Sequence, residues 1–158
     1  MRNSAVEAIP SLVIKKIIRA KREKVFEAFT DPRLLQKWLI GRAGWSGKST
    51  MDFRVGGSFR QEMIVGPVGD SACSGELPEG TVLPYYGEYL EILPPEKLVF
   101  TWNSPSVQNT RVTVELTDRG DTTELWLTHE LLETEALRTS HTGGWNVCLE
   151  NLDQLFSN

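Results

Sequence analysis

The stretch TGGWNVCLENLDQLF, residues 142–156, decides how this chain folds, because its apolar residues recur at helical spacing. These apolar positions are Trp145, Cys148, Leu149, Leu152, Leu155 and Phe156. A stripe of this width allows the helix to lie flat on a sheet. We expect Ser140 or Thr142 to cap the helix, with Gly143 and Gly144 near its start.

Segments with strand character precede this helix. They cover residues 12–19, 50–55, 58–65, 85–93, 97–103, 110–117 and 122–131. Apolar residues alternate with polar ones in the later segments, so each of these strands is expected to have one buried and one solvent-exposed face. Gly56 and Gly57 predict a hairpin turn between the second and third segments. Residues 41–50 and 66–84 are predicted to be loops, the second of them long.

Two short helices are predicted directly after the first strand. Val25, Phe26 and Phe29 give the first an apolar stripe, and it ends before Pro32. Asp31 is suited to cap the second helix, with Pro32 at its first position. This order excludes a simple βαβ repeat. The simplest packing is an α+β fold, in which a curved seven-stranded antiparallel sheet wraps around the long C-terminal helix.

Length and charge narrow the range of functions. A chain of 158 residues suffices for one core, so we expect a single domain over residues 1–158. The formal net charge of -4 argues against nucleic acid as a partner. The sequence shows neither a leader peptide nor a membrane span, which predicts a cytoplasmic location. Cys73 and Cys148 belong to no ligand cluster, so we expect no metal and no cofactor.

The ordered motifs of residues 12–156 resemble a known family. They include Val25-Phe26-Glu27-Ala28-Phe29-Thr30-Asp31-Pro32, Trp38, Val55-Gly56-Gly57, Gly87-Glu88-Tyr89-Leu90-Glu91-Ile92, Pro94-Pro95-Glu96-Lys97-Leu98-Val99-Phe100-Thr101-Trp102, Thr128-His129-Glu130 and Gly144-Trp145. The chain resembles the START-like superfamily, and within it the homologues of the activator of the heat-shock-protein ATPase. The resemblance implies a helix-grip fold with a cavity between helix and sheet, and a link to the stress response. Members of the superfamily bind lipids, sterols, polyketides or plant hormones, and some are cyclases.

The inward-facing apolar residues are the predicted lining of that cavity, together with one histidine. This set consists of Trp38, Phe59, Met63, Phe100, Trp102, Leu125, Leu127, His129, Trp145 and Leu149. A packed core explains any one of these residues equally well. Several tryptophans on one sheet face nevertheless favour a pocket for a small apolar molecule.

Three functions follow from this pattern. The leading hypothesis is binding of a hydrophobic small molecule, without catalysis. A second is an enzyme of the cyclase or dehydratase type, in which His129 acts with a carboxylate such as Glu88. A third is an interaction domain whose partner, a chaperone or a second copy of the chain, contacts the outer sheet face at Trp126. His141 is expected to be exposed or to lie at the cavity entrance.

Overall fold

The computed structural model describes residues 9–40, 44–66 and 77–157. The chain forms seven strands and three helices in an α+β arrangement. Their bounds are β1 Leu12–Ile18, α1 Arg22–Thr30, α2 Pro32–Trp38, β2 Ser46–Met51, β3 Ser58–Ile64, β4 Val82–Leu93, β5 Lys97–Trp102, β6 Thr110–Asp118, β7 Thr123–Glu130 and α3 Glu135–Leu155.

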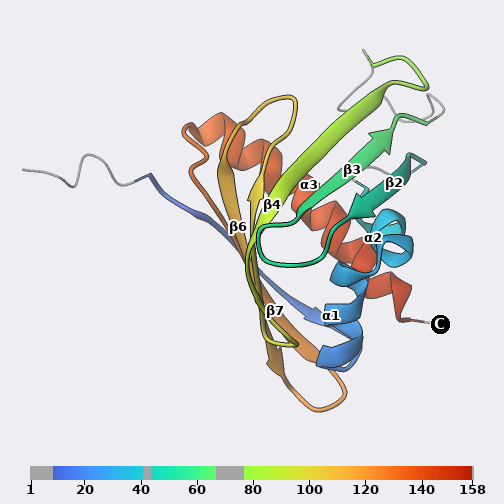
Figure 1. Ribbon diagram of the computed structural model, residues 1–158, viewed down its shortest axis with the longest axis vertical. Helices are drawn as coiled ribbons and strands as arrows, with labels where there is room; N and C mark the ends of the chain where they lie inside the picture. Colours follow the sequence, from blue (N-terminus) through green and yellow to red (C-terminus); the bar gives the residue numbers. More distant parts are fainter. Residues whose placement is uncertain (1–8, 41–43, 67–76, 158) are drawn as a thin grey trace, which may run out of the picture.

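The strands form one antiparallel sheet in the order β1-β7-β6-β5-β4-β3-β2. The sheet is strongly curved, and α3 runs across its hollow side, as Figure 1 shows. The helices α1 and α2 lie beside the C-terminal half of α3, and α2 contacts both α3 and β2. The predicted seven-stranded antiparallel sheet around a C-terminal helix is therefore confirmed, and it is consistent with the helix-grip fold.

The junction between α1 and α2 has the predicted chemistry. The Asp31 side chain accepts a hydrogen bond from the main-chain N–H of Arg33, and Pro32 occupies the first position of α2. An N-cap carboxylate satisfies a main-chain donor that the helix itself leaves unpaired. Proline at the first helical position has no N–H that needs a partner. As a result α1 ends at Thr30 and α2 begins at Pro32, with only Asp31 between the two helices.

Two predicted strand boundaries are wrong. The second strand was expected at residues 50–55, but β2 spans Ser46–Met51 and takes up the second half of the predicted loop 41–50. Its register on β3 places Ser46 opposite Ile64 and Met51 opposite Phe59. The fourth strand begins at Val82 rather than Tyr85, because β3 continues to pair with it there. The centre of the predicted loop 66–84, with Cys73, lies outside the described residues.

The start of α3 is also corrected. The helix begins at Glu135, after an N-cap at Thr134 whose side chain accepts a hydrogen bond from the Leu137 main-chain N–H. Ser140 and Thr142 are therefore helical residues and not caps. Gly143 and Gly144 lie inside the helix, although glycine lowers helix stability at such positions. Thr142 instead turns its hydroxyl back to the carbonyl oxygen of Arg138.

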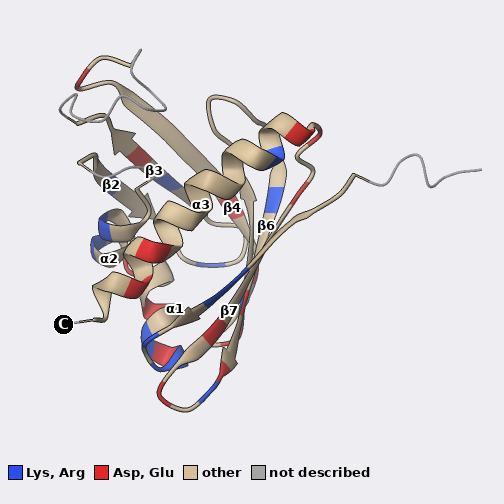
Figure 2. Ribbon diagram, turned by 180° about the vertical axis from the view of Figure 1, so that it is seen from behind, with Lys and Arg blue, Asp and Glu red and all other residues tan. Residues whose placement is uncertain are grey.

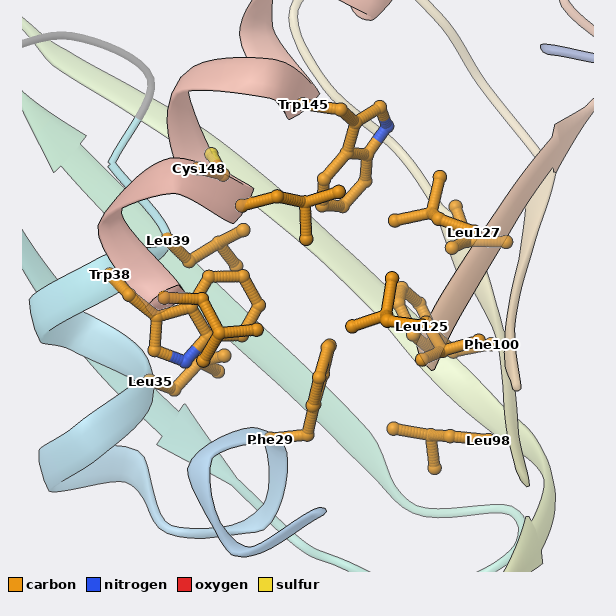
Figure 3. Packing of buried hydrophobic residues seen from close by; sticks show 14 of the residues in the cluster. Phe29, Leu35, Trp38, Leu39, Leu98, Phe100, Leu125, Leu127, Trp145 and Cys148 are labelled. Atoms are coloured by element: carbon orange, nitrogen blue, oxygen red, sulfur yellow. The ribbon is translucent and has the colours of Figure 1, made fainter. Parts of the chain in front are cut away.

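The core fills the space between the helices and the sheet. Figure 3 shows Phe29 from α1, Leu35 and Trp38 from α2, and Trp145 from α3 pointing toward side chains of β5 and β7. The β5 and β7 side chains in that view are Leu98, Phe100, Leu125 and Leu127. All of these side chains are buried. Burial of this apolar surface supplies the main force that holds the helices on the sheet.

Acidic and basic residues are interspersed over the elements drawn in Figure 2. At the end of β1, Arg19 holds Asp153 of α3 with its main-chain N–H and its guanidinium. Lys16 pairs with Glu150 one turn earlier on the same helix. Within the described ranges, none of the helices has the length and apolar character that crossing a membrane requires.

Candidate ligand-binding site

A hollow of about 610 Å³ lies between the first half of α3 and the sheet. Its walls come from α3, from β3 to β5, from the connection after β5 and from the residues around β2. The lining residues are Leu39, Trp45, Met63, Tyr85, Trp102, Ser104, Ser106, Thr139, Ser140, His141, Gly143, Gly144, Trp145, Val147 and Cys148. The walls are mixed in character, with aromatic side chains on the sheet side and hydroxyl groups among the helix and loop residues.

Aromatic side chains form the inner wall. The ring centroids of Trp102 and Trp145 lie 5.0 Å apart, and those of Tyr85 and Trp102 lie 5.3 Å apart. Burial raises the pKa of the Tyr85 phenol, so this side chain stays neutral. Rigid aromatic faces of this kind bury large apolar area with little loss of side-chain entropy. The wall is suited to contact a flat apolar surface.

His129 lies behind this wall and is fully buried. The Trp145 Nε1–H donates to His129 Nδ1 at 3.0 Å, and His129 Nε2 lies 2.8 Å from the Thr110 hydroxyl. That hydroxyl donates to the carbonyl oxygen of Trp102 at 2.7 Å, so it accepts from His129 Nε2–H. The imidazole is therefore neutral, and each of its two nitrogens forms a hydrogen bond. Burial, with a smaller contribution from His141, lowers the pKa of His129 to about 3.

The alternative hypothesis, in which His129 acts with Glu88, requires the two side chains to meet, and they do not. Glu88 is exposed on β4, between the buried Gly87 and Tyr89, while His129 is buried on the inner side. Successive residues of a strand point to opposite faces, which separates the carboxylate from the imidazole. His129 therefore connects α3 with β7 and β6 and does not form an acid–base pair with Glu88.

His141 occupies a different position from His129. It lies in α3 among the cavity-lining residues, half-buried, with its ring centroid 5.2 Å from that of His129. Its Nδ1 lies 2.8 Å from the carbonyl oxygen of Leu137, which can only accept, so the hydrogen is on Nδ1. Of the two expected positions, exposed or at the cavity entrance, the half-buried place at the wall of the hollow fits the second.

Trp102 has an unmet hydrogen bond. Its side chain is 3% exposed, and its indole N–H has no partner among the described residues. A buried donor without an acceptor costs about 1–3 kcal/mol, and native proteins contain few such groups. Trp102 lines the hollow, but its Nε1 atom is itself buried from solvent.

Gly143 and Gly144 form a bare patch on the α3 side of the hollow. A Cβ atom built at either position would meet nothing within 4 Å. Each glycine in a helix interior costs about 1 kcal/mol relative to alanine. The fold therefore loses helix stability at two adjacent residues where alanine would fit.

The structure brings together part of the predicted site. Met63, Trp102 and Trp145 line the hollow. Trp38, Phe59 and Phe100 instead surround, together with Trp102 and Trp145, a second void of about 20 Å³, near the size of one water molecule. Leu125, Leu127, His129 and Leu149 line neither space and are fully or almost fully buried in the core.

Several lining residues were missed by the sequence reasoning. Ser104 and Ser106 lie in the connection between β5 and β6, where the two hydroxyl oxygens are 3.2 Å apart. Thr139 and Ser140 lie in the first turns of α3, which was predicted to start later. Cys148 is buried, and burial raises the pKa of its thiol to about 12. Its thiol thus stays protonated.

Among the described residues, no group of three or more His, Cys, Asp or Glu side chains could hold a metal ion. The side chains that line the hollow include four aliphatic hydroxyl groups, one imidazole, one phenol and three indoles. Such groups orient a ligand through hydrogen bonds.

Comparison with known proteins assigns the family. The family model described as "Activator of Hsp90 ATPase homolog 1-like protein" matches residues 19–157. The crystal structure of a protein from Chromobacterium violaceum is similar, with 25% identity, a TM-score of 0.74, and coverage of 94% of this chain and 98% of that one.

Two further solved structures share the fold. One is an AHSA1-like protein from Aeromonas hydrophila, with 21% identity, a TM-score of 0.74, and coverage of 92% of this chain and 90% of that one. The other is a Rhodobacter sphaeroides protein, with 23% identity, a TM-score of 0.74, and coverage of 93% and 92%. No curated protein matches the sequence. With the family match over most of its length and the fold shared with these structures, the chain belongs to the family of Activator of Hsp90 ATPase homolog 1-like proteins.

Proposed function

We propose that this protein binds a small, largely apolar molecule in the hollow between α3 and the sheet. The observation that carries the proposal is the size and lining of this space. Its volume of about 610 Å³ falls within the range of ~300–1,000 Å³ typical of ligand pockets. Three of the five tryptophans of the sequence line it, namely Trp45, Trp102 and Trp145.

Binding without catalysis is the form of the proposal that the side chains support best. The buried imidazole of His129 has both nitrogens in hydrogen bonds, and its pKa is far below neutrality. A general base needs a free lone pair and a pKa near the working pH. The Cys148 thiol is buried and protonated, which makes it a poor nucleophile. These two groups therefore support a structural role better than a chemical one.

Tryptophan fluorescence tests the proposal directly. We expect one or more members of a panel of fatty acids, sterols and aromatic polyketides to change the emission of the wild-type protein in a saturable way. Trp126 lies on the outer sheet face, so Trp126→Phe serves as a control that keeps the dissociation constant and the response. Trp45→Phe, at the wall of the hollow, reduces the response. A panel without any saturable response, or a response that disappears with Trp126→Phe, contradicts the proposal.

A second candidate function is binding of a protein partner, a chaperone or a second copy of this chain, through the outer face at β1 and β7. Trp126 is 37% exposed there, and Val13 and Ile17 of the neighbouring strand are 54% and 46% exposed. Lys15, the cross-strand neighbour of Trp126, has its ammonium 5.7 Å from the centre of the indole. Neighbouring exposed apolar side chains of this kind mark interaction surfaces.

Sedimentation analysis separates the two kinds of partner. A concentration-dependent dimer that Trp126→Ala abolishes would identify a second copy as the partner. A monomer at all concentrations, combined with retention of a purified Hsp90-type chaperone that Trp126→Ala removes, would identify the chaperone. A monomer that retains no chaperone contradicts this second function. The cytoplasmic location expected from the sequence stays a prediction.

A further inference from the structure

We propose that two copies of this chain pair through the outer face of β1, β7 and β6, about a two-fold axis along β7 that sets Lys15 of each copy opposite Glu115 of the other. The inference rests on the second candidate function above, partner binding through this face. It commits the face to a second copy and specifies how the two copies are arranged.

Three exposed residues form a row across the outer face. Lys15 of β1 and Glu115 of β6 are both register partners of Trp126 on β7. Leu125 and Leu127, the neighbours of Trp126 along the strand, are fully buried, so Trp126 and its partners lie on the opposite face of the sheet. Adjacent strands lie about 4.8 Å apart. A positive and a negative side chain therefore start at nearly equal distances on either side of the indole.

The two charges of this row are left unpaired by the fold. Neither Lys15 nor Glu115 forms an ion pair with the described residues, and the Lys15 ammonium lies 5.7 Å from the centre of the Trp126 ring. The other charged side chains nearby are paired within the chain: Arg111 with Glu130 at 2.9 Å, Arg119 with Glu124 at 2.7 Å and Lys97 with Glu91 at 3.5 Å. The last pair involves the β5 residue opposite Glu115. The free charges thus flank Trp126 and have opposite signs.

A two-fold axis along β7 uses this pattern twice. When two sheets face each other across such an axis, Trp126 meets Trp126 of the other copy and the two sides of the row exchange places. Lys15 of each copy then faces Glu115 of the other, which gives two ion pairs. An axis across the strands would instead set Lys15 against Lys15 and Glu115 against Glu115, and like charges repel. The charge pattern therefore selects the axis along β7.

Apolar contacts support the same arrangement. Val13 and Ile17 of β1 are 54% and 46% exposed. In the neighbouring rows of the sheet, the β6 residues on the far side of β7 are Thr113 for Val13 and Thr117 for Ile17. The rotation sets β1 of one copy over β6 of the other, so each aliphatic side chain faces a threonine methyl group. Exposed apolar surface is covered in both copies.

Glu124 of β7 faces its own counterpart across the axis. Its carboxylate is already bound by the Arg119 guanidinium and the Trp126 Nε1–H, which compensates its charge. The contact covers three strands of a sheet that curves around α3 and so away from the partner (Figure 1). Small interfaces of this kind give weak and reversible association. We therefore expect a dimer that dissociates on dilution.

Charge reversal tests the pairing in the full chain, by sedimentation equilibrium at low salt. Lys15→Glu and Glu115→Lys should each weaken dimerisation of the protein at least about tenfold, because like charges then meet at two places. An equimolar mixture of these two variants should pair as strongly as the wild type, since every reversed charge faces an opposite one. The double variant should also pair with itself. Lys24→Glu and Glu79→Lys, exposed in α1 and before β4, are the matched controls and should change nothing.

The outcomes separate this inference from the function on which it rests. A wild-type dimer that both single variants weaken, and that the mixture and the double variant restore, supports the inference. If the dimer is lost with Trp126→Ala but unaffected by either charge reversal, the outer face stands as the interface and the proposed arrangement is overturned. Single variants that the mixture does not rescue overturn it too. A wild type that is monomeric at all concentrations overturns it, also where the face retains a purified Hsp90-type chaperone.

Discussion

The indole N–H of Trp145 donates a hydrogen bond of 3.0 Å to Nδ1 of His129, which joins the C-terminal helix to the inner face of β7. The same imidazole reaches Thr110 on β6 with its other nitrogen. One buried side chain thus connects the helix with two strands directly behind the wall of the hollow. Because every donor in this chain of hydrogen bonds has an acceptor, the connection is stable without charge.

Removing the imidazole should destabilise the protein. His129→Leu keeps a similar volume but leaves the Trp145 N–H without its acceptor in the core. We expect a loss of about 2–3 kcal/mol in the free energy of unfolding, from the unpaired donor and the lost hydrogen bonds. Urea denaturation followed by circular dichroism measures it. A loss below about 0.5 kcal/mol would mean that this connection does not hold α3.

Protonation of His129 predicts how stability depends on pH. Its pKa is lowered from 6.5 to about 3 in the folded protein, so below pH 6.5 the unfolded chain binds a proton that the folded protein does not. Stability is therefore fully present above pH 6.5 and is lost progressively as pH falls from there toward 3. Between pH 7.5 and 5.5 we expect a loss of about 1 kcal/mol. His129→Gln has no proton to gain at this position, so an equally large loss in that variant would contradict the assignment.

The contact between Arg19 and Asp153 should hold the far end of α3. Burial opposes ionisation of Asp153, but the hydrogen bonds from Arg19 outweigh it and keep the pKa of this carboxyl below its ordinary value. Asp153→Asn should therefore lower the Tm more than Glu150→Gln, which removes only the exposed pair with Lys16. This difference in Tm should disappear as the pH falls through the lowered pKa of Asp153, because the wild-type carboxylate then becomes protonated. Equal Tm values for the two variants at pH 7 would argue against the role of the Arg19–Asp153 contact in holding α3.

The Cys148 thiol should be unreactive in the folded protein. Burial raises its pKa to about 12, and only the thiolate attacks an electrophile. In a Cys73→Ser background, Cys148 is the single thiol of the sequence. We expect no reaction with Ellman's reagent at pH 8 until urea unfolds the protein. Rapid reaction under native conditions would show that the hollow exposes the sulfur.

The sequence predicts the sheet well where alternation and turns are strong. In β5, β6 and β7 the inward apolar residues alternate with outward polar ones, and Leu125 and Leu127 are buried as this pattern indicates. The cap at Asp31 is a local arrangement that needs no tertiary contact, and it was predicted too. By contrast, β2 has the sequence SGKSTM, and its polar residues form a strand through pairing with β3.

The first turns of α3 and much of the site depend on contacts that the sequence pattern does not reveal. Ser140 or Thr142 was expected to cap the helix, whereas Thr134 supplies the cap. Alternation also indicates which face a strand residue occupies and not how far along the sheet the hollow lies. Leu125 and Met63 both point inward, but only Met63 lines the hollow. Ser104 and Ser106 come from a loop, where no periodicity marks an inward residue.

The indole N–H signals of the five tryptophans provide the most direct measurement of the central claim. In ¹⁵N–¹H NMR spectra recorded during titration with the panel of fatty acids, sterols and aromatic polyketides, a molecule that occupies the hollow should shift the indole signals of Trp45 and Trp102. Trp126, on the outer sheet face, should not respond. Spectra in which Trp126 alone responds, or in which all five signals stay unchanged across the panel, would contradict the claim that this hollow is a binding site.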